Sequence, residues 1–307
     1  MQNNIKILLT ILYAVSAYLI LSLFPKNVIA QTISLSVTPP IVEVMIAPGK
    51  SIKQTFTISN DGGNTLITPK IVYFTPSDNA GNVDLSEDQA PEWIKYDKTP
   101  FSLNTGQKHD FKISIEPPAD AEEIDHFLTL VFENDVPTDI LGQTSTLFTT
   151  QIGSNILLTI SKDGNPKKSA SIIKFSAPKV IDSTFGEIKY QIEVKNSGNS
   201  FWKPNGKIII DGEPNQSLKL APQNILSGYS RKLMCIKDEV LTECLSVNKK
   251  IIGIVKSSLE FQLDEDSKIY KAETTTYSFP FAGIAIIIFL LTSFKRRWIF
   301  KLWRKEI

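Results

Sequence analysis

The sequence predicts an all-β protein of two tandem immunoglobulin-like β-sandwich domains, with an apolar segment at each end. Between the ends, short runs of alternating apolar and polar residues are separated by Pro, Gly, Asn and Asp, a pattern typical of sandwiches. Nothing between the ends has the period of a long amphipathic helix. The length of 307 residues fits about two domains at roughly 150 residues each.

The amino-terminal segment predicts a signal peptide over residues 1–30. Ile7 to Phe24 carry no charge and follow Lys6. Val28 and Ala30 then place small side chains at the two positions that a signal peptidase recognises, so cleavage is expected after Ala30. The apolar run is long for such a signal, and an uncleaved membrane anchor is the alternative.

The carboxy-terminal segment predicts a transmembrane helix over residues 277–294 and a basic cytoplasmic tail over residues 295–307. The run from Phe279 to Phe294 is apolar, and Lys295, Arg296 and Arg297 follow it directly. Cations on one side of an apolar span mark its cytoplasmic end, whereas a buried core helix is the less favoured reading. A single-pass protein of the cytoplasmic membrane is expected, with residues 31–276 outside the cell or in the periplasm.

The first sandwich is predicted over residues 31–164. In the run Ile52 to Ser59, the residues Ile52, Phe56 and Ile58 share one face. Such alternation requires one buried and one solvated face. Leu128 to Phe132 are more continuously apolar, as expected of a central strand.

The second sandwich is predicted over residues 165–276, where Ile188 to Lys195 alternate in the same way. The segments FTISNDGGN (56–64) and YQIEVKNSGN (190–199) are an internal echo, in which a strand ends in Asn and a Gly-containing turn follows. Asn and Gly close tight turns, so both modules are expected to share this geometry. The polar run from Lys162 to Ser169 holds turn formers, and the boundary is placed near Asn165.

Several of these segments resemble WxL-interacting proteins, which are bacterial surface proteins with two immunoglobulin-like modules and a carboxy-terminal membrane helix. In the first module the resemblance rests on residues 39–43, 47–49 and 57–60, and in the second on residues 196–199, 203–208 and 224–231. The resemblance implies peptidoglycan binding by the first module and protein binding by the second. It assigns no binding residue, because each motif consists of turn and strand residues.

Cys235 and Cys244 are the two cysteines of the chain. Outside the cytoplasm, two cysteines nine positions apart can close a hairpin as a disulfide. Two free buried thiols are the alternative, and a metal pair is disfavoured because no histidine lies nearby.

Phe201 and Trp202 are the candidate ligand contacts. Trp202 follows directly on the Asn-Gly turn of the second module, where an exposed indole stacks on a sugar ring or fills a partner's pocket. The alternative, which is favoured, is that Trp202 and Trp93 cap the two sandwich cores.

No catalytic, cofactor-binding or metal-binding residue is predicted, and the protein is not expected to be an enzyme. His109 and His126 lack catalytic or zinc-binding contexts, and the acidic run from Asp78 to Asp88 lacks the calcium-loop spacing. A solvated loop is therefore expected there. The net charge of +1 gives no reason to expect nucleic acid.

The predicted function is that of a membrane-anchored bacterial cell-surface binding protein. Its tandem modules would recognise a cell-wall polymer such as peptidoglycan, a partner surface protein, or both, without a cofactor. The alternative is a chaperone-like or structural assembly subunit of a membrane complex that acts by edge-strand pairing.

Overall fold

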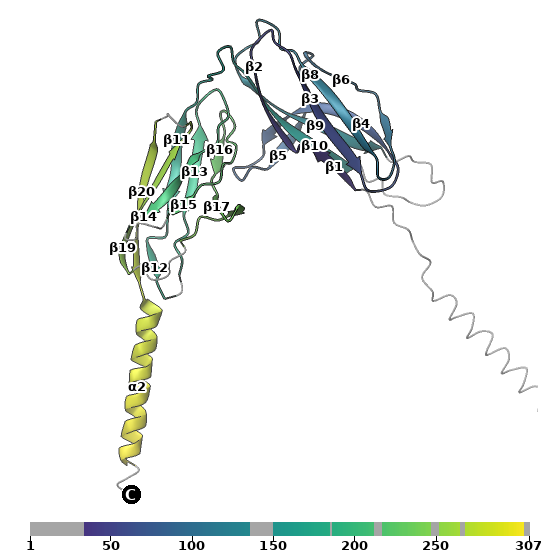
Figure 1. Ribbon diagram of the computed structural model, residues 1–307. Helices are drawn as coiled ribbons and strands as arrows, with labels where there is room; N and C mark the ends of the chain where they lie inside the picture. The colour runs from purple at the N-terminus through teal and green to yellow at the C-terminus, as the bar shows by residue number, and fades with distance from the viewer. Residues whose placement is uncertain are drawn as a thin grey trace, which may run out of the picture.

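The computed structural model describes residues 34–135, 150–184, 186–211, 217–246, 252–264 and 268–303. Its ribbon has two β-modules set at an angle to each other, and helix α2 (Phe281–Trp303) leaves the far end of the second module (Figure 1). In the described residues every other element is a strand. The fold is therefore an all-β, two-domain fold.

Two sheets face each other in the first module. One has the strand order β1-β3-β8-β6, and the other has the order β2-β10-β9-β4-β5 with β7 paired to β4. Their strands are β1 (Leu35–Thr38), β2 (Ile41–Ile46), β3 (Ile52–Asn60), β4 (Thr65–Pro76), β5 (Val83–Gln89), β6 (Ile94–Tyr96), β7 (Phe101–Leu103), β8 (Lys108–Ile115), β9 (Asp125–Asp135) and β10 (Thr150–Ile160).

The first core lies between these sheets and follows the predicted alternation. Phe56 and Ile58 of β3 are fully buried, and Leu128 and Phe132 of the central strand β9 are buried with them. Ile52, which was expected on the same buried face, is exposed because it is the first residue of β3 and lies at the rim.

The second module has a three-stranded sheet β11-β13-β16, a five-stranded sheet β12-β20-β19-β14-β15 and a separate hairpin β17-β18. Ile188, Tyr190, Ile192 and Val194 all point into its core. The strands are β11 (Ala170–Ser176), β12 (Val180–Asp182), β13 (Gln191–Asn196), β14 (Asn205–Ile210), β15 (Ser217–Lys219), β16 (Ser230–Lys232), β17 (Cys235–Lys237), β18 (Val240–Thr242), β19 (Gly253–Gln262) and β20 (Tyr270–Phe279).

The internal echo has a structural basis in two buried asparagines. The side-chain amide of Asn60 donates to the carbonyls of Gly63 and Leu103, and its oxygen accepts the N–H of Gly62. Asn196 uses its side chain in the same way, toward Ser200, Ile225 and Gly198. Each asparagine satisfies buried backbone groups at the end of a strand, so the repeated motif is explained by turn formation.

The predicted transmembrane helix over residues 277–294 is wrong. β20 runs to Phe279, so Tyr277 to Phe279 belong to a sheet. α2 begins at Phe281, and its apolar part before Lys295 is about 14 residues, or roughly 21 Å at 1.5 Å per residue, against a hydrocarbon core of about 30 Å. Among the described residues, no helix is long and apolar enough to cross a membrane.

The predictions that depended on that span are corrected with it. They are the single-pass location in the cytoplasmic membrane, the placement of residues 31–276 outside that membrane, and the cytoplasmic tail over residues 295–307. Residues 295–303 of that predicted tail belong to α2. The predicted signal peptide over residues 1–30 lies outside the described residues.

Candidate functional site

The strand β10 is paired on both sides along only half of its length. β9 pairs with it from Thr150 to Thr159, whereas β2 pairs with it only from Asn155 to Ile160. Within the part of the chain that the structure describes, Thr150 to Ser154 therefore have a sheet neighbour on one side alone. We call these five residues the open edge.

The open edge exists because the preceding chain changes sheets at Pro39 and Pro40. β1 pairs with β3 of the opposite sheet, and β2 then joins β10 in parallel, with a cis peptide bond between Thr38 and Pro39 at the change. Proline has no N–H to give to a ladder. The chain therefore begins to form ladder pairs with β10 only at Ile41, after the two prolines.

Two hydrogen bonds show which backbone groups face the open side. The N–H of Asn155 donates to the carbonyl of Pro40 at 3.0 Å, and the N–H of Ser161 donates to that of Ile46 at 3.1 Å. Because strand backbones alternate with period two, the odd-numbered positions of β10 point to this side. At the open edge these positions are Gln151 and Gly153.

The side chains around the open edge are held in place. The hydroxyl of Ser154 donates to the carbonyl of Pro39 at 2.6 Å, and the amide of Gln151 donates to Glu133 at 2.7 Å. Ile152 packs against the first core. Gly153 is required by close approach, because a Cβ there would lie 2.7 Å from Cγ2 of Thr129.

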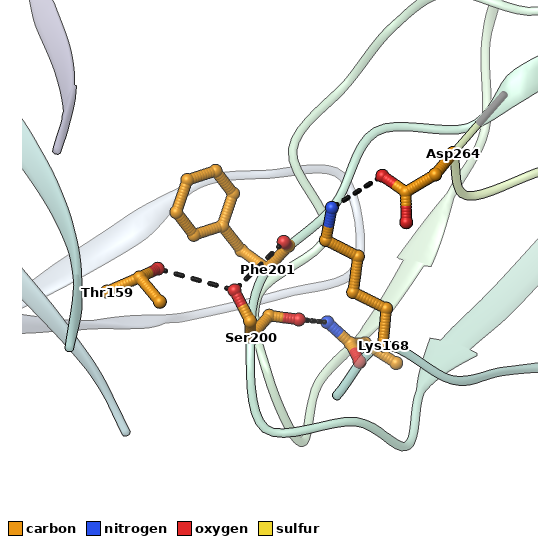
Figure 2. Close-up of polar contacts among 6 residues, drawn as sticks. Thr159, Lys168, Ser200, Phe201 and Asp264 are labelled. Atoms are coloured by element: carbon orange, nitrogen blue, oxygen red, sulfur yellow. Dashed lines mark hydrogen bonds and ion pairs between the residues drawn. The ribbon is translucent and has the colours of Figure 1, made fainter. Parts of the chain in front are cut away.

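The two modules meet beyond the covered half of β10. The backbone N–H of Phe201 donates to a carboxylate oxygen of Asp125 at 2.5 Å, and Thr159 donates to the other oxygen at 2.7 Å. Figure 2 shows the hydroxyls of Thr159 and Ser200 facing each other, 3.3 Å apart. Burial raises the pKa of Asp125, so this contact holds a partly desolvated carboxyl group.

A second carboxylate crosses the junction from β2. Glu43 accepts hydrogen bonds from Lys203 and from the amide of Asn224, both at 2.9 Å. Burial alone would raise the pKa of Glu43, but these hydrogen bonds and the charge of Lys203 hold it below its ordinary value. The ionised form of Glu43 is thus stabilised by the other module.

The loop between β4 and β5 contacts the second module at two points. The N–H of Lys232 donates to the carbonyl of Asn79 at 2.7 Å, and the guanidinium of Arg231 lies directly against Gly81. A cavity of about 80 Å³ lies beside these contacts and is lined by residues of both modules. Nε of Arg231 and Oδ1 of Asn224 are buried there without a hydrogen-bond partner.

The acidic run from Asp78 to Asp88 includes this loop. The carboxylate of Asp78 accepts the backbone N–H groups of Ala80, Gly81 and Asn82. The side-chain amide of Asn82 and these N–H groups hold the pKa of Asp78 below its ordinary value. In the described residues, no three His, Cys, Asp or Glu side chains form a group that could hold a metal ion.

The two predicted ligand-contact residues lie in different environments. Trp202 is only 2% exposed and belongs to the second core, so the expected exposed indole is not found and the core alternative describes it. Phe201 is partly buried at the junction, packed against Phe74, Leu157 and Leu226. A disulfide joins Cys235 and Cys244 at the base of the β17-β18 hairpin.

Sequence reasoning missed the open edge and the junction. Asp125 and Phe201 are 76 positions apart, and no local pattern links them. The consecutive prolines at 39 and 40 are the one signal that could have located the open edge, because proline has no N–H to donate to a ladder and interrupts strand pairing.

No family model and no curated protein matches the chain. Among solved structures, it is similar to the class 5 fimbriae chaperone CfaA, with 12% identity over 79% of this chain and 99% of that one and a TM-score of 0.39. The E. coli chaperone DraB has 12% identity, 79% and 99% coverage and a TM-score of 0.38. The Salmonella enterica SafA pilin–SafB chaperone complex has 10% identity over 79% of this chain and 97% of that one, with a TM-score of 0.40.

The resemblance to WxL-interacting proteins is corrected by these findings. No family model matches the chain, that of the WxL-interacting proteins included. The motifs misled because they contain residues such as Asn60 and Asn196 that close turns, and turns of this kind recur in unrelated sandwiches.

Proposed function

We propose that this protein is a non-enzymatic, chaperone-like or structural assembly subunit that binds another surface protein by edge-strand pairing. The observation that carries the proposal is the open edge, since Thr150 to Ser154 form ladder pairs with β9 alone among the described residues. This is the alternative that the sequence left open.

The open edge suits a polypeptide better than a sugar polymer. Adding a strand to a sheet requires a partner with regularly spaced N–H and C=O groups, which a cell-wall glycan does not have. The partner strand would pair with β10 beside the exposed residues Gln151 and Gly153, beyond the point where Pro39 and Pro40 contact the strand, and would bond to the backbone of these two residues. Main-chain bonds supply affinity in this mode, and side chains that alternate along the strand supply specificity.

The rigid surroundings favour such binding. Ser154 is tied to Pro39 and Gln151 to Glu133, so the edge is already extended before a partner arrives. A preorganised edge loses less conformational entropy on binding than a flexible one.

The finer architecture belongs to the same proposal. We infer that both modules are immunoglobulin-like domains, over the expected residues 31–164 and 165–276 with the division near Asn165, and that the second extends to Phe279, where β20 ends. This division is supported by the gap between β10, which ends at Ile160, and β11, which begins at Ala170.

The substitution Gln151→Pro tests the proposal in the full chain. Proline removes an N–H that points to the open side, so the ladder to β9 should be kept. Gln151→Ala is the matched control, because both variants lose the bond to Glu133 and only one loses the N–H. The tagged chain is isolated from its native host, and the stoichiometry of the co-purifying protein is measured.

The expected result is that Gln151→Pro lowers partner recovery at least tenfold while Gln151→Ala retains it. Hydrogen exchange of the isolated complex should also show slower exchange of the Gln151 and Gly153 amides than in the free chain. Equal recovery with both variants, or unchanged exchange at these amides, would contradict pairing at the open edge.

A further inference from the structure

The outer face of β19 and β20 changes abruptly from polar to apolar toward α2. Cross-strand pairs along this face begin with Glu260–Lys271, which form an ion pair, and continue with Lys256–Thr275. The next pair is Ile254–Tyr277, with 64% and 45% of their surfaces exposed. Exposed apolar side chains are not by themselves unusual, but on this face of β19 and β20 they occur only in the last rows.

β12 and α2 extend the apolar rows on either side. Val180 pairs with Tyr277 in parallel and is 57% exposed. Ile252, Phe279 and Phe281 are exposed as well. We call Val180, Ile252, Ile254, Tyr277, Phe279 and Phe281 the base patch.

α2 is fixed to this patch by capping from the β12 turn. The carboxylate of Asp182 accepts the N–H of Ala282 at 2.7 Å, and the hydroxyl of Thr184 accepts that of Gly283 at 3.0 Å. These bonds satisfy first-turn N–H groups that a helix leaves free. The base patch therefore adjoins the exposed apolar side chains of α2 between Ile284 and Leu291, which lie all around the helix at the end of the second module (Figure 1).

We propose that this surface docks against the same surface of a second copy of the chain. A two-fold contact brings each patch against itself, which would repel if the patch carried a net charge. No member of the base patch carries a charge at neutral pH. The ion pair of Glu260 and Lys271 lies on the same face beyond the apolar rows and remains solvated.

The available area is sufficient for a stable dimer. With side chains about half exposed, the base patch and the one side of α2 that can face a second copy offer on the order of 1,000 Å² of apolar surface per copy. Covering most of it on both copies reaches the roughly 1,200–2,000 Å² in total that is typical of specific complexes. Contiguous apolar patches larger than a few hundred Å² commonly mark interfaces.

Cysteine crosslinking in cells that express the full chain tests the proposal. Tyr277→Cys places a thiol in the base patch, and Glu273→Cys places one on the same face of β20, four residues away or roughly 13 Å. With the native cysteines paired, one new thiol forms only intermolecular disulfides. Mild oxidation should give at least fivefold more dimer with Tyr277→Cys than with Glu273→Cys.

A second substitution separates a specific contact from chance encounters. Adding Ile254→Lys to Tyr277→Cys should lower the dimer yield at least fivefold, because it places a cation opposite its own copy. Equal yields for the two single thiols, or linkage of Tyr277→Cys mainly to a different protein, would overturn the proposal. The Gln151→Pro substitution should leave this crosslink unchanged, so failure here is distinguishable from failure of edge-strand pairing.

Discussion

Arg231 of the second module lies so close to Gly81 of the first that no side chain fits between them. A Cβ built on Gly81 would fall 2.2 Å from Nη2 of Arg231. The neighbouring bond from Lys232 to Asn79 ties the same loop to the edge of β16. The close approach of the two modules at this point therefore depends on the absence of a Cβ at position 81.

Gly81→Ala is expected to loosen the junction. The Cβ must displace the Arg231 guanidinium, which lies partly buried beside the junction cavity. Small-angle scattering should show a larger radius of gyration or a broader interdomain distance distribution. Gly106→Ala is the control, because Gly106 also has positive φ but nothing within 4 Å of the added Cβ. Both variants carry a backbone cost of about 1 kcal/mol; if both leave the scattering unchanged, the glycine does not set the angle.

Asp125→Asn is expected to flatten the pH dependence of stability. Burial raises the pKa of Asp125 above its ordinary value, so the folded state binds a proton more tightly than the unfolded state does. The folded state is therefore favoured at low pH, and this contribution is lost as pH rises through the raised pKa. Asparagine can still accept the N–H of Phe201 and donate to Thr159. Urea denaturation at a series of pH values around the raised pKa should show a smaller decline in the free energy of unfolding for the variant than for the wild type. An identical pH profile would contradict the role of Asp125 in this pH dependence.

Glu43→Gln should change the pH dependence of stability in the opposite direction. Lys203 and Asn224 hold the pKa of Glu43 below its ordinary value, so its ionised form stabilises the folded state at neutral pH, and this stabilisation is lost as pH falls through the lowered pKa. At pH 7 the variant is expected to be less stable by about 0.5–1 kcal/mol, as for partly exposed ion pairs. Raising the salt concentration should lower the free energy of unfolding of the wild type and leave that of the variant nearly unaffected. Equal salt sensitivity would argue against the ion pair.

The disulfide can be tested by mass. Alkylation of the native chain without reductant is expected to add no alkyl group, and alkylation after reduction to add two. The double substitution Cys235→Ser and Cys244→Ser should lower the free energy of unfolding by about 2–3 kcal/mol for so short a loop. Uptake of two alkyl groups before reduction would favour the free-thiol alternative.

The sequence determined most of the core positions within its alternating runs, with Ile52 at the start of β3 as an exception. Phe56 and Ile58 alternate with polar residues along the chain, and so do Ile188, Tyr190, Ile192 and Val194. This alternation is enough to predict the buried faces, because side chains of a strand alternate between its two faces whatever its neighbours are. It also determined the repeated asparagine turns, since Asn60 and Asn196 form their bonds largely within one turn.

Only the tertiary structure decided which strands lie side by side, and the candidate site depends on that. The apolar run from Tyr277 suits a strand or a helix equally well, and pairing with β12 and β19 makes its first residues a strand. The open edge of β10 exists because β2 arrives at Asn155 from more than a hundred residues away. Local sequence encodes the conformational preference of a segment, whereas contacts between distant segments depend on the whole chain.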